Sequence, residues 1–154
     1  MKHNTTHHLP QLTPWLNISG LENVSGRGYY STSFNWTKSS SSYHHQTSAK
    51  DAVMIDFGAI VHTVRVSVNG HTLAPLDLTW AKADISEHLV NGLNTIEAVV
   101  ATPLYNRLKP IAADLFSSGQ GWSAMSGAPV TLPTNPLQDY GLLNDVTVTQ
   151  YTES

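Results

Sequence analysis

The sequence predicts an all-β fold, a single antiparallel β-sandwich or jelly roll. Valines alternate with polar residues from Val64 to Val68, which is typical of a strand with one buried face. Asn69 and Gly70 follow, and both tolerate the positive φ angles that a type I′ hairpin turn requires. Other short alternating runs are separated by turn residues, and no long amphipathic helix is apparent. At 154 residues the chain has the length of one domain with a substantial core.

The first part of the chain predicts a leader and then an aromatic strand. Residues 1–13 are polar and rich in histidine, so we expect a leader or linker there, and a sandwich domain over 14–154. Residues 29–36 alternate, and the even-numbered positions carry most of the aromatic weight. We expect these even-numbered side chains on the inner face of the strand.

The middle of the chain predicts loops around one short strand. Residues 37–50 are rich in serine and histidine and fit a surface loop. Residues 53–57 form a short apolar run that ends at Gly58, and we expect a strand there. After the hairpin over 64–73, residues 75–80 are expected to form a connecting loop or a sheet edge.

A helical turn and another strand are expected next. Asp84 or Ser86 can cap a short helical turn, and Gly92 can end it. Residues 95–101 then have the pattern of a strand, which Pro103 ends.

The last third of the chain predicts a long loop and a closing strand. Residues from about 105 to 140 contain several glycines and prolines and no clear strand, and loops of this length are often functional. Residues 142–151 predict a final strand, with Val146 and Val148 on its buried face.

Composition excludes some classes of partner. The formal net charge is −3 and the few lysines and arginines are scattered along the sequence, so we expect no nucleic-acid partner. No apolar run approaches the roughly 20 residues that span a bilayer, so we expect no membrane partner. The chain has no cysteine, which excludes disulfides and thiolate metal sites.

The N-terminal region leaves the cellular location open. It has no hydrophobic segment of the kind found in signal peptides. A cytoplasmic location follows if Met1 is the native start, and a secreted one follows if the domain was excised from a larger secreted protein. Four N-glycosylation motifs favour secretory ancestry, and they begin at Asn4, Asn17, Asn23 and Asn35.

Several short motifs resemble a known superfamily. The order of elements is similar to the galactose-binding-like jelly-roll domains attached to glycoside hydrolases, including the sugar-binding domain of family 2 enzymes. The matching segments are Gly28-Tyr29-Tyr30, Asp56-Phe57-Gly58, the run from Val66 to Gly70, Asp84-Ile85, and Leu89 with Gly92 and Asn94. Asn106-Arg107-Leu108 and the run from Tyr140 to Leu143 more narrowly resemble the C-terminal β-sandwich of fungal proteins similar to family 106 α-L-rhamnosidases.

This resemblance implies an accessory or carbohydrate-binding module, with an upstream catalytic domain as a partner. In the parent enzymes the catalytic carboxylates lie in a separate barrel domain that has no counterpart in this sequence, so no catalytic residue is carried over. Two other functions stay open. One is a stand-alone small-molecule enzyme, such as a cyclase or isomerase, with a pocket in the same fold, and the other is a structural interaction domain.

Aromatic residues near loops and strand ends are candidates for ligand binding. Sugar binding needs an aromatic platform and polar groups that reach the hydroxyls. The candidate residues are Trp80, Tyr105, Asn106, Arg107, Trp122 and Tyr140. A structural role is the alternative, with Trp80 and Tyr140 as core or corner aromatics and Arg107 in a hydrogen-bond network.

Arg65 is a further candidate on the polar face of its strand. It could line a concave sheet face that receives a ligand, or pair with Glu97 in a surface ion pair. His62 is expected to be a satisfied polar residue with no catalytic role. We expect no cofactor, and a structural calcium ion is compatible with the fold, although no dense aspartate cluster assigns it.

Overall fold

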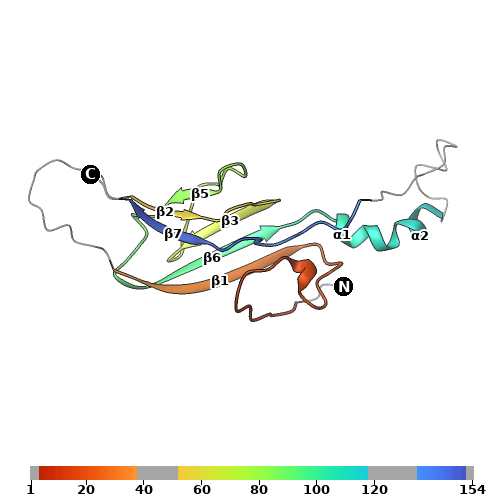
Figure 1. The fold of residues 1–154 in the computed structure, drawn as a ribbon, viewed down its shortest axis with the longest axis horizontal. Helices are drawn as coiled ribbons and strands as arrows, with labels where there is room; N and C mark the ends of the chain where they lie inside the picture. The colour runs from red at the N-terminus through yellow and green to blue at the C-terminus, as the bar shows by residue number, and fades with distance from the viewer. Residues whose placement is uncertain (1–3, 38–51, 118–134, 152–154) are drawn as a thin grey trace, which may run out of the picture.

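The protein is a sandwich of two antiparallel sheets, which confirms the predicted fold class (Figure 1). The computed structural model describes residues 4–37, 52–117 and 135–151. The strands are β1 (Arg27–Trp36), β2 (Ala52–Asp56), β3 (Thr63–Val68), β4 (His71–Thr72), β5 (Lys82–Asp84), β6 (Gly92–Ala101) and β7 (Thr147–Tyr151). One sheet has the order β1-β6-β3-β4, and the other has the order β5-β2-β7.

The four-stranded sheet is built around β6. β1 pairs with it over its whole length, from Arg27 opposite Ala101 to Trp36 opposite Gly92. β3 pairs with the other side of β6, and the hairpin to β4 turns at Asn69 and Gly70. These two residues have φ angles of 49° and 81°, so the predicted turn is confirmed.

The three-stranded sheet is built around β2. Asp56 of β2 lies opposite Lys82 of β5, and their side chains form an ion pair of 2.9 Å between Nζ and Oδ2. The N–H of Gly58 donates to Oδ1 of Asp56 at 2.8 Å. This hydrogen bond and the Lys82 ammonium group lower the pKa of the Asp56 carboxyl.

Two expectations about local structure need correction. The segment expected to form a capped helical turn begins instead with β5, and only a single turn follows, in which the His88 N–H donates to the Ile85 carbonyl at 2.9 Å. Asp84 is the capping acceptor, because its Oδ1 accepts from the Ser86 N–H at 2.9 Å.

The expected long loop begins with helical turns, which lie beyond one end of the sheets (Figure 1). They are α1 (Tyr105–Leu108), the 3-10 helix η2 (Lys109–Ile111) and α2 (Ala112–Ser117). Leucine and alanine favour helix here, and the sequence pattern missed them because each helix is too short to show a repeat. A further 3-10 helix, η1 (Trp15–Asn17), precedes β1.

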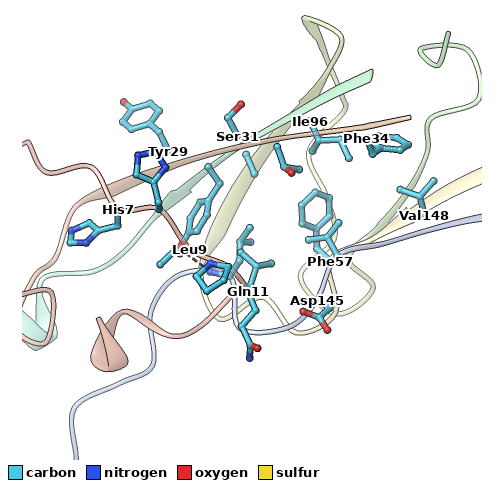
Figure 2. Close-up of a pocket in the computed structure, with 18 residues that line it drawn as sticks. His7, Leu9, Gln11, Tyr29, Ser31, Phe34, Phe57, Ile96, Asp145 and Val148 are labelled. Carbon is cyan, nitrogen blue, oxygen red and sulfur yellow. Dashed lines mark hydrogen bonds between the residues drawn. The ribbon is translucent and has the colours of Figure 1, made fainter. Parts of the chain in front are cut away.

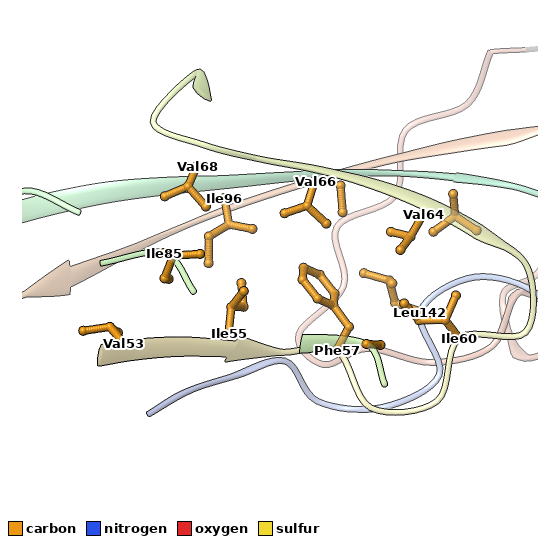
Figure 3. Packing of buried hydrophobic residues seen from close by; sticks show 13 residues of the cluster. Val53, Ile55, Phe57, Ile60, Val64, Val66, Val68, Ile85, Ile96 and Leu142 are labelled. Atoms are coloured by element: carbon orange, nitrogen blue, oxygen red, sulfur yellow. The ribbon is translucent and has the colours of Figure 1, made fainter. Parts of the chain in front are cut away.

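The main core lies between the two sheets (Figure 3). The alternating valines of β3 face residues of β2 across this space, as the sequence predicts. The buried residues are Val53, Ile55, Phe57, Ile60, Val64, Val66, Val68, Ala81, Ile85, Ile96, Ala98, Val100 and Leu142. Tyr30, Phe34 and Trp36 pack against this core but are only partly buried, because β1 is an outer strand of its sheet.

Candidate functional site

A groove of about 1070 Å³ opens between the sheets along the side where β1 and β7 lie. β1 and β7 are the outer strands of their sheets in the described chain, so no neighbouring strand covers the space between them. Figure 2 shows His7 and Tyr29 toward one end, Phe34 and Val148 toward the other, and Phe57 between them.

The floor of the groove is apolar. Phe57 is buried at its base, while Phe34 is only half-buried and presents ring surface to the opening. Aliphatic side chains complete the floor, and they are Ile96, Ala98, Leu142, Val146 and Val148. This floor is continuous with the core, so the groove is an open margin of the sandwich interior.

The rim of the groove is polar, and part of it comes from the N-terminal segment. Residues 7–12 form one wall, and Leu12 anchors this wall by packing against the core. Gln11 and Asp145 are exposed at the rim, and Thr32 adds a hydroxyl group from β1. An apolar floor with a few polar groups at its edge is the usual composition of a small-ligand site.

Asn106 and Tyr140, two of the predicted ligand-binding residues, lie together in a buried corner of the sandwich. Their side chains are 1% and 0% exposed. The Asn106 amide donates to the Gln138 carbonyl at 2.7 Å and accepts from the Gln138 N–H at 2.9 Å. The Tyr140 hydroxyl accepts from the Asn106 N–H at 3.4 Å. Both side chains hold the chain in place and offer no surface to a ligand.

This corner is closed by a second aromatic side chain. Trp15 packs edge-on against Tyr140, with ring centroids 6.2 Å apart, and its Nε1 donates to the Tyr30 hydroxyl at 2.7 Å. The Leu142 N–H donates to the same hydroxyl at 3.2 Å. The corner therefore ties the segment before β1 to the segment before β7.

The other predicted residues are dispersed. Tyr105 donates its hydroxyl proton to the Asn135 carbonyl at 3.0 Å, and Arg107 is exposed on α1. Trp80 is 58% exposed in the turn before β5, and Arg65 is exposed on the outer face of the four-stranded sheet. Trp122 lies outside the described residues. None of the six predicted residues in the described chain lines the groove, and they are Arg65, Trp80, Tyr105, Asn106, Arg107 and Tyr140.

Arg65 and Glu97 do not form the surface ion pair that was one reading of their positions. Arg65 lies opposite Val99, and Glu97 lies opposite Ser67, so the two are diagonal neighbours. Arg65 forms no ion pair with any described residue, so its exposed side chain can contact a ligand on the outer face.

His62 differs from the expected satisfied polar residue. Its ring packs against Tyr140 with centroids 5.0 Å apart, and its Nε2 is buried with no hydrogen-bond partner among the described residues. Burial lowers the pKa of the His62 imidazole from its ordinary value of 6.5, because the charged ring loses hydration.

We expect His62 to make the protein less stable in mild acid. Below about pH 6.5 the unfolded chain protonates this histidine, while the folded chain keeps it neutral. The free energy of unfolding therefore decreases as the pH is lowered, until the pH reaches the lowered pKa of the folded state. Urea unfolding between about pH 7.5 and about pH 5 measures this dependence. His62→Phe should flatten the curve, whereas His8→Phe at an exposed position should not. Equal slopes for the wild type and His62→Phe would contradict the assignment.

No pattern in the sequence indicates the groove directly. Phe34 was expected on the inner face of its strand, and alternation correctly predicts that orientation. Alternation contains no information about which strands lie at the margin of a sheet. Phe34 is partly exposed because β1 is an outer strand in the strand order of its sheet. A closer reading of residues 7–12 could have found the anchoring leucines, which interrupt an otherwise polar segment.

The described residues contain no group of three or more histidine, cysteine, aspartate or glutamate side chains placed to hold a metal ion. Within the same ranges, no helix has the length and apolar character needed to span a membrane.

The sequence matches no family model and no curated protein. Among solved structures, the chain is similar to a rhamnosidase from Novosphingobium sp. PP1Y, with a TM-score of 0.66 and 24% identity. This likeness covers 93% of the chain and 13% of the rhamnosidase, and it shows a shared fold. A β-D-glucuronidase from Dictyoglomus thermophilum gives a TM-score of 0.43 at 22% identity, covering 66% of this chain and 17% of that one. A GH2 β-galacturonidase from Eisenbergiella tayi gives 0.45 at 17% identity, covering 67% and 17%.

Proposed function

We propose that the chain is a non-catalytic, carbohydrate-binding module of a rhamnosidase-like glycoside hydrolase, with the sugar held in the groove between β1 and β7. The observation that carries the proposal is the combination of an aromatic and aliphatic floor with a polar rim in one open groove. The fold shared with part of a rhamnosidase supports the proposal that the chain is a module of a larger glycoside hydrolase. The resemblance to family 106 proteins extends the proposal to an adjoining catalytic domain as the partner.

The groove fits the chemistry of a sugar. A pyranose ring has an apolar C–H face, which packs on aromatic rings, and a perimeter of hydroxyl groups, which need hydrogen-bond partners. The half-buried ring of Phe34 supplies the first surface. Gln11, Thr32 and Asp145 lie at the rim and can supply the second. The volume of about 1070 Å³ is at the upper end of small-ligand pockets, which suits an oligosaccharide more than a single sugar.

Variants at the rim and floor of the groove should weaken sugar binding. Calorimetric titration with rhamnose-containing and galactose-containing oligosaccharides measures the affinity. We expect Gln11→Ala and Asp145→Ala each to weaken it by about fivefold to tenfold, because each removes a hydrogen bond worth about 1 kcal/mol. Phe34→Leu should also weaken it, since leucine keeps most of the apolar volume but removes the aromatic face.

Exposed residues away from the groove provide matched controls. Gln138→Ala and Asp139→Ala remove the same side chains at exposed positions that do not line the groove, and should leave affinity unchanged. Trp80→Ala separates the groove from the loop aromatics that the sequence pointed to. Loss of binding in Trp80→Ala alone would move the site to that turn, and a lack of binding to every oligosaccharide would overturn the binding role.

A further inference from the structure

The outer face of the four-stranded sheet brings distant basic residues together at one end. Arg27 lies opposite Ala101, and Tyr29 lies opposite Val99. Val99 in turn lies opposite Arg65 on the far side of β6. Because the valines of β3 that flank Arg65 are buried in the core, the odd-numbered residues of these strands point outward. Arg27, Tyr29 and Arg65 therefore share one exposed surface, which we call the arginine face.

The third arginine of the sequence, Arg107, has its backbone close to the start of β1. The N–H of Arg107 donates to the Ser25 hydroxyl at 3.3 Å, only two residues before Arg27. The Gly26 and Thr102 backbones are also hydrogen-bonded there, at 2.9 Å, which fixes the approach of α1 to the start of β1. The backbone of Arg107 therefore lies close to the start of β1, although Arg27 and Arg107 are 80 positions apart in a protein with a net charge of −3.

No acidic side chain among the described residues neutralises the charges of Arg27 and Arg65 on the arginine face. The guanidinium groups of Arg27 and Arg65 are exposed and form no ion pair or side-chain hydrogen bond with any described residue. The acidic residue in the adjoining row is Glu97, which lies opposite Ser31 and Ser67. The two cations are therefore available to an anionic ligand. Such a ligand would be repelled by the Glu97 carboxylate if it extended further along β6.

We propose that the arginine face binds a carboxylate-bearing polysaccharide, that is, a polymer containing uronic acid units. Tyr29 is 74% exposed and provides an aromatic platform for a sugar ring. Arginine recognises carboxylates through paired hydrogen bonds, and it keeps its charge at every physiological pH. In the sheet register, the Cα atoms of Tyr29 and Arg65 are about 10 Å apart, so ring and cation contact different sugar units of a chain.

This site goes beyond the proposed groove function and is independent of it. The groove offers an apolar floor and suits neutral sugars, whereas the arginine face is flat, cationic and open. The two sites adjoin at Tyr29, which also borders the groove, so variants at the two arginines separate their contributions.

The test compares an acidic polymer with its neutral counterpart. Polygalacturonate and carboxyl-reduced polygalacturonate are titrated into the protein at about 50 mM salt and again at about 300 mM. We expect binding of the acidic polymer only, and weaker binding at the higher salt concentration. The double variant Arg27→Gln/Arg65→Gln should lose at least about tenfold in affinity. Lys82→Gln removes a cation from the other sheet and should retain affinity, while Glu97→Gln should bind the acidic polymer more tightly.

Three outcomes would overturn the proposal. The first is equal binding of the acidic and carboxyl-reduced polymers. The second is wild-type affinity in the double arginine variant, with its fold verified by circular dichroism. The third is equally tight binding of duplex DNA, which would show a general polyanion surface instead of recognition of a uronic acid chain. If the wild-type protein binds polygalacturonate but no neutral oligosaccharide, the groove function alone is overturned and the arginine face stands.

Discussion

Replacing Gly141 with alanine is expected to lower the free energy of unfolding by about 4 kcal/mol. Gly141 has a φ of +99°, which strains any residue with a side chain. A Cβ at this position would also come within 2.5 Å of the Tyr30 hydroxyl oxygen and 2.6 Å of Trp15 Nε1. These two atoms are hydrogen-bonded to each other, so they cannot both move aside without breaking the corner. Urea or thermal unfolding measures the loss.

Gly92 provides a matched control for this prediction. It has the same φ of +99°, but no atom lies within 4 Å of the position its Cβ would take. Gly92→Ala therefore reports the backbone strain alone, which we expect to cost about 1–2 kcal/mol. The difference between the two variants measures the close approach at the corner. Equal losses would show that Trp15 and Tyr30 can repack, and would contradict our account of the corner.

Asn94→Ala is expected to cost about 3 kcal/mol, because it breaks a buried hydrogen-bond network. The Asn94 side chain is 0% exposed, and its Oδ1 accepts from the Val90 N–H at 2.9 Å and from Asn69 Nδ2 at 2.7 Å. Its Nδ2 donates to the carbonyls of Val90 and Gly92 at 2.8 and 2.9 Å. Alanine leaves these backbone groups without partners in a place that water reaches poorly. Denaturant unfolding measures the loss.

A second variant separates this network from the hairpin turn. Asn69→Gly keeps the positive φ that the turn requires but removes the amide, which also accepts from the Thr95 N–H at 2.9 Å. It should therefore destabilise the protein, by less than Asn94→Ala. Asn35→Ala, at an exposed position of β1, should change the stability by less than about 0.5 kcal/mol. A neutral result for Asn94→Ala would contradict the network.

The turn chemistry and strand periods in the sequence predicted much of the fold. The alternation from Val64 to Val68, the Asn69–Gly70 turn and the run over 95–101 correspond to β3, its hairpin and most of β6. These signals are local, because alternation and positive φ depend on residues next to one another. The short helices after β6 were missed for the same reason, since four to six residues are too few to show a helical period.

The candidate sites needed more than local signals. The residues singled out around 105–107 and 140 come together only in the folded chain, where Asn106 and Tyr140 face inward and fill a corner. Tyr29 and Arg65 gain a common surface only because β6 lies between β1 and β3.

The sequence by itself therefore determined most of the strands, the hairpin turn at Asn69 and Gly70, and the apolar faces of the alternating strands. Tertiary structure alone decided which strands lie at the margins, and thereby where the interior opens. β1 and β7 are far apart in the sequence, and their positions follow from pairings with β6 and β2. Such pairings depend on packing between residues tens of positions apart, which no short pattern records. For this reason the groove beside Phe34 and the shared outer surface of Arg27 and Arg65 became visible only in the folded chain.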